Sequence, residues 1–266
     1  MTLIAILAAT LAAGIGSVWV AAFLGLGAMA RFTQHLLSLA AGALLATAFM
    51  HLLPEAFESG IDPKRLFVTL LVGVVFFFLL DKAELWHHGH EHHHDHGHDH
   101  HGHGHAHGHD HAHHDRPSGS WAVLAGDSVH CFGDGILIAS AFMADLRLGV
   151  VAALAVLAHE VPHHMGDLIV LRQGSGDRRA ALVKVSLAGA VTALGGVVGY
   201  WLVDQLHDYL PYFLTVASSS FVYVALADLI PQLQKRLSAR ETAAQVAWLF
   251  VGIALVTVVS GLAHAH

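Results

Sequence analysis

Two short stretches of the sequence place metal-binding side chains inside long apolar runs. They read GDSVHCFGDG at residues 126–135 and HEVPHHMGD at residues 159–167. Imidazole, thiolate and carboxylate groups are the ligands that proteins use for Zn²⁺ and similar ions. An ionisable side chain at the centre of a bilayer costs at least about 2.5 kcal/mol on insertion scales, so a cluster of them indicates function.

Helical spacing brings four of these side chains together. His130 and Asp134 are four residues apart, and so are His159 and His163, so each pair lies on one face of its helix. Two neighbouring antiparallel helices would carry both pairs at a similar depth. Three imidazoles and one carboxylate form a suitable ligand set for a tetrahedral ion such as Zn²⁺.

A second site is expected beside the first. Glu160 and His164 form another pair with helical spacing, turned by about 100° from the first pair. Cys131 directly follows His130 and adds a thiol. The candidate metal ligands are therefore His130, Asp134, His159, His163, Glu160, Cys131 and His164.

The letters HEVPH also match the H-E-x-x-H motif of zinc proteases, in which two His bind the metal and Glu is the base. An intramembrane zinc metalloprotease is therefore the enzyme alternative. Pro162 argues against it, because proline lacks the N–H that would bond to the Ala158 carbonyl and so predicts a kink in this helix. Interrupted helices beside a polar path are typical of transporters, so we expect transport and no enzyme activity.

The composition predicts an all-α integral membrane protein surrounded by the lipid bilayer. Hydrophobic residues make up 55% of the chain and charged residues 12%, whereas soluble domains carry about 25% charged residues. The single cysteine excludes a disulfide within one chain. The formal charge of −7 argues against a nucleic-acid partner.

Eight apolar runs are long enough to span a membrane, since a spanning helix needs about 20 residues. They cover residues 3–24, 34–53, 65–85, 121–143, 148–171, 181–203, 210–230 and 243–263. Lys and Arg are enriched in cytosolic loops. With the N-terminus outside, the inside segments carry ten of these residues and the outside segments three. Both termini are therefore predicted outside, and the first run is predicted to be a spanning helix and not a signal peptide.

Residues 86–116 hold seventeen of the 26 histidines. This polar segment cannot form a core, so residues 86–117 are predicted to be a disordered cytosolic loop between spans 1–3 (residues 1–85) and spans 4–8 (residues 118–266). Imidazole binds Zn, Cu, Ni and Co well, so the loop is interpreted as a metal buffer, with a plain linker as the alternative. Its first histidines are His87, His88, His90, His92, His93, His94, His96 and His98.

Five further polar residues in the spans are candidates for a metal pathway. His51 and Glu55 have helical spacing at the outer end of the second span and are interpreted as an entrance, with simple interfacial placement as the alternative. Asp127, Asp167 and Asp228 lie toward the inner side and are interpreted as an exit, with solvation at helix ends as the alternative.

Taken together, these motifs resemble the ZIP (Zrt/Irt-like) metal transporters, in the branch with a His-rich cytosolic loop. HCFGDG is similar to the fourth-span motif H-N-x-x-D-G of that family, and HEVPHHMGD is similar to its fifth-span motif H-E-x-P-H-E-x-G-D. HLLPEAFE at residues 51–58 and YVALADLIPQL at residues 223–233 resemble the ends of its second and seventh spans. The order of the motifs and the position of the loop agree over nearly the whole chain.

The resemblance implies eight helices with both termini outside, and an inverted repeat of spans 1–3 and 6–8 around spans 4 and 5. It implies a binuclear site with a main set (His130, Asp134, His159 and His163) and a secondary set (Cys131 and Glu160, sharing His163). Zn²⁺ would be a bound substrate and not a prosthetic group, with Cd²⁺, Fe²⁺ and Mn²⁺ as further candidates. An elevator-type motion would move the ion into the cytosol. A homodimer in the plasma membrane, or in the inner membrane of a bacterium, is implied as well.

Two positions depart from the family motifs, because Cys131 stands where Asn is usual and His164 where Glu is usual. Both changes make the site softer and less acidic, which favours Zn²⁺ or Cd²⁺ over Mn²⁺. A packing role is the alternative for Cys131. An exporter of the cation-diffusion type is the other transporter alternative, since those proteins also pair His and Asp in the membrane. They usually have six spans and a C-terminal cytosolic domain, for which residues 264–266 leave no room.

Overall fold

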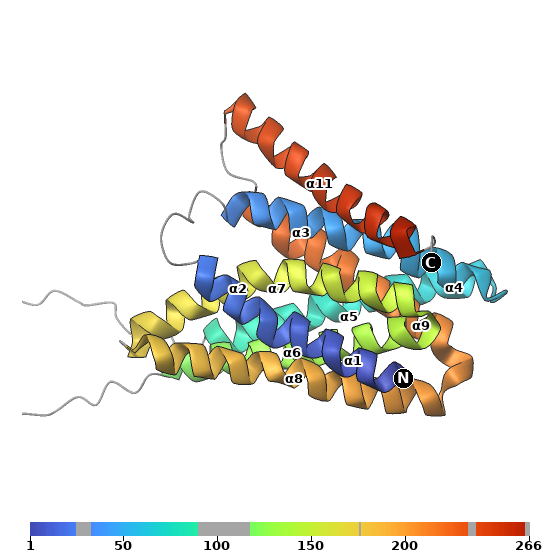
Figure 1. The fold of residues 1–266 in the computed structure, drawn as a ribbon, viewed down its shortest axis with the longest axis horizontal. Helices are drawn as coiled ribbons and strands as arrows, with labels where there is room; N and C mark the ends of the chain where they lie inside the picture. The colour runs from blue at the N-terminus through green and yellow to red at the C-terminus, as the bar shows by residue number, and fades with distance from the viewer. Residues whose placement is uncertain (25–32, 90–117, 176, 234–237, 264–266) are drawn as a thin grey trace, which may run out of the picture.

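A computed structural model of the chain describes residues 1–24, 33–89, 118–175, 177–233 and 238–263, and every regular element in these ranges is a helix (Figure 1). The α-helices are α1 (Thr2–Leu11), α2 (Ser17–Leu24), α3 (Thr33–Thr47), α4 (Leu53–Glu58), α5 (Pro63–Gly89), α6 (Ser118–Ala144), α7 (Leu146–Ser175), α8 (Arg178–Gln205), α9 (Leu210–Tyr223), α10 (Ile230–Leu233) and α11 (Ala239–Ala263). Short elements of other helical types are η1 (Ala12–Gly16), η3 (Ala48–Leu52), η4 (His207–Tyr209) and η5 (Val224–Leu229).

Seven described stretches are long and apolar enough to cross a membrane, by length and composition. They are Thr2–Leu24, Thr33–Glu58, Pro63–Lys82, Leu146–Arg172, Arg178–Gln205, His207–Leu233 and Ala239–Leu262. Seven of the eight predicted spans agree with them to within five residues. The remaining predicted span, residues 121–143, falls within α6, a helix of 27 residues that is not among the seven.

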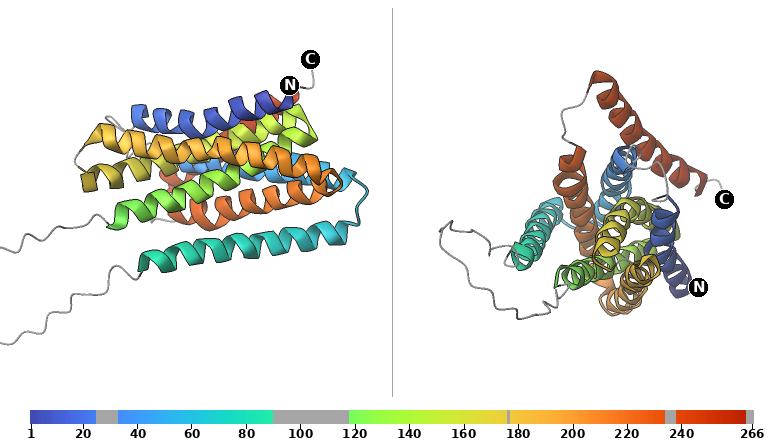
Figure 2. Two further views of the ribbon diagram at one scale, coloured as in Figure 1. Left: turned by 90° about the horizontal axis from the view of Figure 1, so that it is seen from below. Right: turned by 90° about the vertical axis from the view of Figure 1, so that its left-hand side faces the viewer.

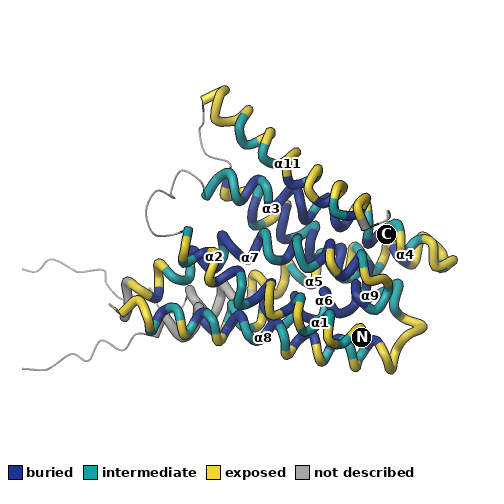
Figure 3. Tube along the Cα trace, in the orientation of Figure 1, coloured by how far each residue is buried: buried dark blue, intermediate teal, exposed yellow. Residues whose placement is uncertain are grey.

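The outer surface of the bundle is apolar, as a lipid environment requires. Only 11% of the most apolar window is buried in α5, and the same holds for α11. Large side chains such as Phe67 and Leu71 of α5 and Phe250 and Leu262 of α11 are exposed. By contrast, α3, α7 and α9 are buried along much of their length (Figure 3). An all-helical bundle with this surface is that of a membrane protein.

The helices form two groups, which Figure 2 shows side by side. In the α6 group, α6 packs along α7 and α8, and α1 and α2 pack against α8 and α7. In the α3 group, which also holds α4 and α10, α3 packs along α11 and α5 packs along α9. The two groups meet where α7 lies against α3 and where α6 lies against α9.

Glycines let the helices of each group approach until their backbones touch. A Cβ atom on Gly135 of α6 would lie 2.0 Å from a carbonyl oxygen of α8, and one on Gly195 of α8 would lie 2.1 Å from a carbonyl oxygen of α6. Gly42 of α3 and Gly252 of α11 each approach a carbonyl oxygen of the other helix at 2.1 Å in the same way. Lipid supplies no hydrophobic force between helices, so the close packing that these small residues allow is what stabilises their association.

Three of the spans contain a wide π-helical turn, namely η1, η3 and η5. η3 and η5 each end two residues before a proline, Pro54 and Pro231. Each proline therefore sits in the first turn of a new helical segment, where its missing N–H costs little. α7 is one helix through Pro162, and the kink expected there stays a prediction.

The outer ends of α1 and α11 lie at the opposite end of the bundle from the helix ends that flank residues 90–117 (Figure 1). The start of α1 and the end of α11 are at one end, whereas the end of α5 and the start of α6 are at the other. α5 extends to Gly89, four residues past the predicted end of the third span. Residues 90–117, which make up most of the predicted loop, lie outside the described residues.

Replacing Gly135 by Ala is expected to destabilise the protein, because the new methyl group must push the α8 backbone away from α6. Overpacking of this kind costs about 1–3 kcal/mol. The matched control is Gly133→Ala on the same helix, where a Cβ atom meets nothing within 4 Å. There the substitution is expected to stabilise the helix by about 0.5–1 kcal/mol. Thermal unfolding of both purified variants in detergent tests this, and equal unfolding temperatures would contradict the packing argument.

Candidate metal centre

The turn between α6 and α7 sets the register of the two polar stretches. Asp145 joins the helices: its carbonyl oxygen accepts from the N–H of Gly149 at 3.0 Å, and its Oδ1 accepts from the N–H of Arg147 at 2.8 Å, which caps α7. His130 and Glu160 each lie fifteen residues from Asp145, a distance of about 22 Å along either helix. The two stretches therefore meet at the same depth.

The first cluster joins His130 and Asp134 of α6 to His159 and Glu160 of α7. The Nε2 atom of His159 lies 3.1 Å from Oδ2 of Asp134 and 3.4 Å from Oε1 of Glu160. The Nε2 atom of His130 lies 3.3 Å from Nε2 of His159 and 3.3 Å from the same Glu160 oxygen. The other three side chains are buried, whereas that of His130 is 30% exposed and forms the open edge of the cluster.

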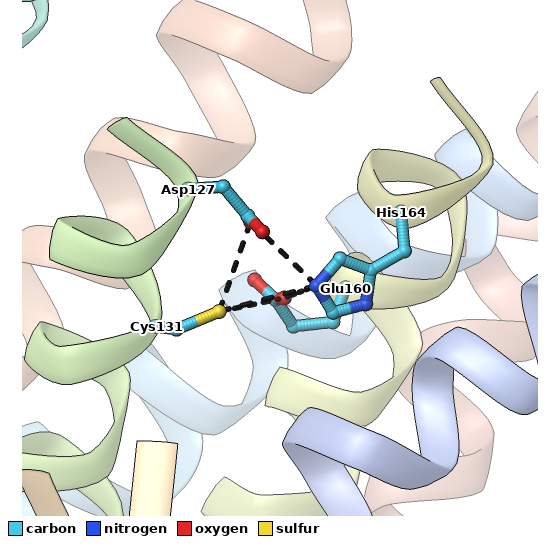
Figure 4. Close-up of side chains that lie close together, drawn as sticks. All are labelled: Asp127, Cys131, Glu160 and His164. Atoms are coloured by element: carbon cyan, nitrogen blue, oxygen red, sulfur yellow. Dashed lines mark hydrogen bonds and ion pairs between the residues drawn. The ribbon is translucent and has the colours of Figure 1, made fainter. Parts of the chain in front are cut away.

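The second cluster joins Asp127 and Cys131 of α6 to Glu160 and His164 of α7 (Figure 4). The Nε2 atom of His164 lies 3.0 Å from Oε2 of Glu160 and 3.6 Å from Oδ1 of Asp127. The Cys131 Sγ atom lies 3.6 Å from Oε2 of Glu160, 3.7 Å from Oδ1 of Asp127 and 3.9 Å from Nε2 of His164. The sulfur, the imidazole and both carboxylates point toward one another in Figure 4.

The spacing of the donor atoms suits a tetrahedral ion in both clusters. With bond lengths of about 2.0–2.3 Å, the ligand atoms around Zn²⁺ lie about 3.3–3.8 Å apart. Ten of the distances between donors in the two clusters run from 3.0 to 3.9 Å, and all the ligand atoms of each cluster lie within 4.8 Å of one another. Oδ2 of Asp127, Oδ2 of Asp134 and Oε1 of Glu160 are buried and accept no hydrogen bond of good geometry from the described residues. Buried oxygens of this kind are available to a cation.

Glu160 is the residue that belongs to both clusters, with Oε1 in the first and Oε2 in the second. The family resemblance had given this shared position to His163. In the structure, Nε2 of His163 instead lies 2.8 Å from Oδ2 of Asp228 in η5, and the His163 ring stacks on His130 with centroids 5.4 Å apart. Gln232 donates to the other Asp228 oxygen at 2.9 Å.

The separation of His159 from His163 bears on the H-E-x-x-H motif. In a zinc protease both His of the motif bind one ion. Here only His159 belongs to the first cluster, while His163 turns to Asp228. The Glu of the motif, Glu160, has both oxygens among potential ligands and none free to activate a water.

The predicted pathway residues take different places. Asp127 belongs to the second cluster itself, and Asp167 is half-buried on α7, one turn after His163. His51 and Glu55 belong to neither cluster. The first lies in η3, where its Nδ1 is 3.4 Å from the Ser260 hydroxyl, and the second is exposed on α4, near the bundle end that holds the termini (Figure 1).

Most of the predicted loop histidines fall outside the residues that the structure describes. His87 and His88 fall in the last turn of α5. The others named from the sequence lie outside the described residues: His90, His92, His93, His94, His96 and His98.

One hydroxyl group that touches the second cluster was not predicted from the sequence. The Ser17 Oγ atom lies 2.8 Å from Nδ1 of His164. An isolated Ser or Thr in an apolar span gives little signal, because such hydroxyls generally bond to a backbone carbonyl one turn earlier.

Comparisons with known proteins agree with the geometry. A family model described as ZIP zinc transporter matches residues 82–260. "Zinc transporter ZIP10" of Danio rerio is 36% identical over 114 residues, which cover 43% of this chain and 14% of that protein. "Zinc transporter ZIP4" of Homo sapiens is 36% identical over 115 residues, which cover 43% of this chain and 18% of that protein.

A longer match is found with "Zinc transporter ZIP13" of Pongo abelii, which is 27% identical over 245 residues, covering 85% of this chain and 66% of that protein. The chain thus spans less than a fifth of the length of the ZIP10 and ZIP4 relatives. Several apolar helices and the family match together make it a multi-pass membrane protein. Because the family model matches more than half of the chain, and does so across both metal clusters, the chain belongs to the ZIP zinc transporter family.

Proposed function

We propose that this protein carries Zn²⁺, and divalent ions of similar chemistry, into the cytosol through the two clusters of α6 and α7. The observation that supports this most is the pair of buried four-ligand groups joined by Glu160. A structural zinc site needs only one closed ligand set. Two adjoining sets with a common carboxylate give a bound ion a second position beside the first, as a carrier requires. The relatives named above are zinc transporters, which supports the same cargo.

We infer eight spans with both termini outside, α6 being the eighth. Its 27 residues are long enough to cross a bilayer, and its polar residues face α7 and not lipid. The placement of the chain ends at one end of the bundle fits an even number of spans (Figure 1). The excess of Lys and Arg toward the other end supports a cytosolic position for residues 90–117.

The division into two helix groups supports an elevator-type mechanism in which the α6 group moves against the α3 group. All ligands of both clusters come from α6 and α7, so the cargo would travel with the α6 group. A Cβ atom built on several of the described glycines would lie within 3 Å of an atom of another helix. In each of these cases the other helix belongs to the same group as the glycine. Each group is therefore tightly packed internally, and the boundary between them lacks such close approaches within the described residues.

Local sequence and structure also support the inverted repeat. The second span reads HLLP from His51 to Pro54, and the seventh reads DLIP from Asp228 to Pro231. In both, a π-helical turn holds the polar residue, and the proline follows three residues later. His51 and Asp228 therefore occupy matching positions in the two proposed repeats.

The ion pathway follows from these positions. His51 and Glu55, near the termini, form the proposed entrance. His163 and Asp228, joined at 2.8 Å across the boundary between the groups, form the proposed exit with Asp167. The His-rich segment then receives the ion in the cytosol. A homodimer and the plasma membrane as the location stay predictions.

The two alternatives fit less well. A protease of the H-E-x-x-H type needs both motif His on one ion, and His163 is bound to Asp228 instead. An exporter of the cation-diffusion type would belong to another family, whereas the family match covers both clusters of this chain.

Substituting His159 by Ala is expected to lower zinc flux by at least about tenfold, since even second-shell changes at metal sites cost about 10–100-fold. Glu160→Ala is expected to do the same, because it removes a ligand from both clusters. Radioactive zinc uptake into proteoliposomes that contain the purified protein measures this. His207→Ala, at an exposed residue of η4, is the matched control and should leave the flux unchanged.

A casein cleavage assay on the same preparations tests the enzyme alternative. Zinc-dependent cleavage without flux of any divalent ion would refute the transporter. Flux without cleavage would support it.

Cys131→Asn is expected to raise the uptake of Mn²⁺ or Fe²⁺ relative to Zn²⁺, because a hard amide oxygen replaces a soft sulfur. Competition uptake with mixed ions gives the ratio. The control Cys131→Ala removes the donor without adding a hard one, so it should weaken zinc uptake without favouring Mn²⁺. Unchanged selectivity in both variants would remove Cys131 from the ligand set.

Deleting residues 90–114, which begin directly after α5, is expected to leave a folded transporter with an altered rate. The ligands of both clusters remain, and only the proposed metal buffer is lost. Zinc uptake as a function of external zinc concentration measures the change. Complete loss of transport with normal membrane insertion would show that the segment is part of the pathway itself.

A further inference from the structure

The second cluster is held from outside by a hydroxyl group of the first span. Ser17 begins α2, directly after the π-helical turn η1, and is completely buried together with His164. The distance from its Oγ atom to Nδ1 of His164 is 2.8 Å. Ser17 is not a ligand in either cluster, and it is separated from His164 by 147 positions in the chain.

The direction of the hydrogen bonds around Ser17 is fixed by its single hydroxyl proton. The Ser17 Oγ atom donates that proton to the carbonyl oxygen of Gly14 at 2.6 Å. A hydroxyl that has donated its proton can only accept from a second partner. Nδ1 of His164 must therefore carry the proton and donate it to Ser17. The lone pair of the neutral ring is then at Nε2, which faces Glu160, Asp127 and Cys131.

The acceptor of the Ser17 proton is itself held in place. Gly14 lies in η1, and a Cβ atom there would be 2.0 Å from the carbonyl oxygen of Gly189 in α8. The backbone of the first span is thus pressed against α8 at this point. Because the Gly14 carbonyl cannot shift toward α8, the Ser17 hydroxyl keeps its orientation.

The first cluster has a corresponding device that uses the main chain. Nδ1 of His159 lies 3.2 Å from the carbonyl oxygen of Ala155, one turn earlier on α7. A carbonyl oxygen only accepts, so Nδ1 of His159 carries the proton and Nε2 faces the cluster. His164 uses Ser17 of another span for the same purpose, and this partner can be changed by mutation.

We propose that Ser17 is a positioning residue that fixes the tautomer and ring orientation of His164 and so sets the zinc affinity of the second cluster. This proposal rests on the proposed function, since it assumes that the second cluster binds the cargo. His164 and Cys131 are the two positions that depart from the family motifs. Of the two, His164 has a hydroxyl partner, Ser17. The Ser17–His164 pair therefore belongs to the feature that favours Zn²⁺, Cd²⁺ and Co²⁺ over harder ions.

Co²⁺ binding to the full-length protein in detergent provides the test. Cys131 is the single cysteine of the chain, so a thiolate-to-Co²⁺ charge-transfer band reports the second cluster alone, whatever the His-rich segment binds. Cys131→Ser should abolish the band. Ser17→Ala is expected to lower the Co²⁺ affinity measured from this band by about 10–100-fold, the usual effect of losing a residue that orients a metal ligand. Ser17→Thr, which keeps the hydroxyl, should restore most of the affinity.

Two controls separate positioning from general damage. Ser140→Ala removes a buried hydroxyl that donates to the Ile136 carbonyl at 2.8 Å. This substitution should leave unchanged both the band and the Co²⁺ concentration at which the band reaches half of its full intensity. In a His164→Ala background, Ser17→Ala should cause no further loss of affinity, because Ser17 acts through the imidazole. An additional loss of the full 10–100-fold there would overturn the proposal.

The outcomes also distinguish this proposal from the proposed function. If the unaltered protein shows no thiolate band and no zinc flux, the proposed function fails. If it shows both and Ser17→Ala leaves the Co²⁺ midpoint unchanged, only the positioning role is wrong.

Discussion

A carboxylate deep in an apolar bundle is costly unless polar groups surround both of its oxygens, and Glu160 has imidazole rings on both sides. His130 and His159 lie beside one oxygen and His164 beside the other. Of these three residues only His130 belongs to α6, so its contact with Glu160 depends on the register that the short connection at Asp145 sets between α6 and α7. The contact between His159 of α7 and Asp134 of α6 depends on the same register.

The other helices of the α6 group enclose the hairpin of α6 and α7. Lipid supplies no hydrophobic force between helices, so α8 and α1 approach through Gly135, Gly195 and Gly14, where backbone meets backbone. Close approach in turn brings the Ser17 hydroxyl to 2.8 Å from the His164 ring. The helices that exclude lipid from the clusters therefore also orient the ligands.

Helical spacing predicted much of the centre, because i,i+4 pairs share a face in any helix. It placed Glu160 and His164 with Cys131 in one site, and the structure brings these three together with Asp127. It did not predict that His163 turns to Asp228, since that contact depends on how η5 packs against α7. The π-helical turns were missed for a similar reason: local sequence marks a proline, but packing decides where the helix widens. Hydropathy gave seven spans within five residues, while the polar α6 is the one that an apolar criterion leaves out.

The shared use of Glu160 has a consequence for charge neutrality. The two clusters together contain three carboxylates and one thiol. A thiol gives up its proton when it binds a metal, so the protein would present four negative charges to two divalent ions. The doubly loaded centre then has no net formal charge, and a neutral unit is the form that an apolar bilayer opposes least. In the usual family motifs Asn and Glu stand in place of Cys131 and His164, so this chain reaches the same four negative charges with a thiolate in place of one carboxylate. The single cysteine thus makes full occupancy by two ions the electrically balanced state of this chain.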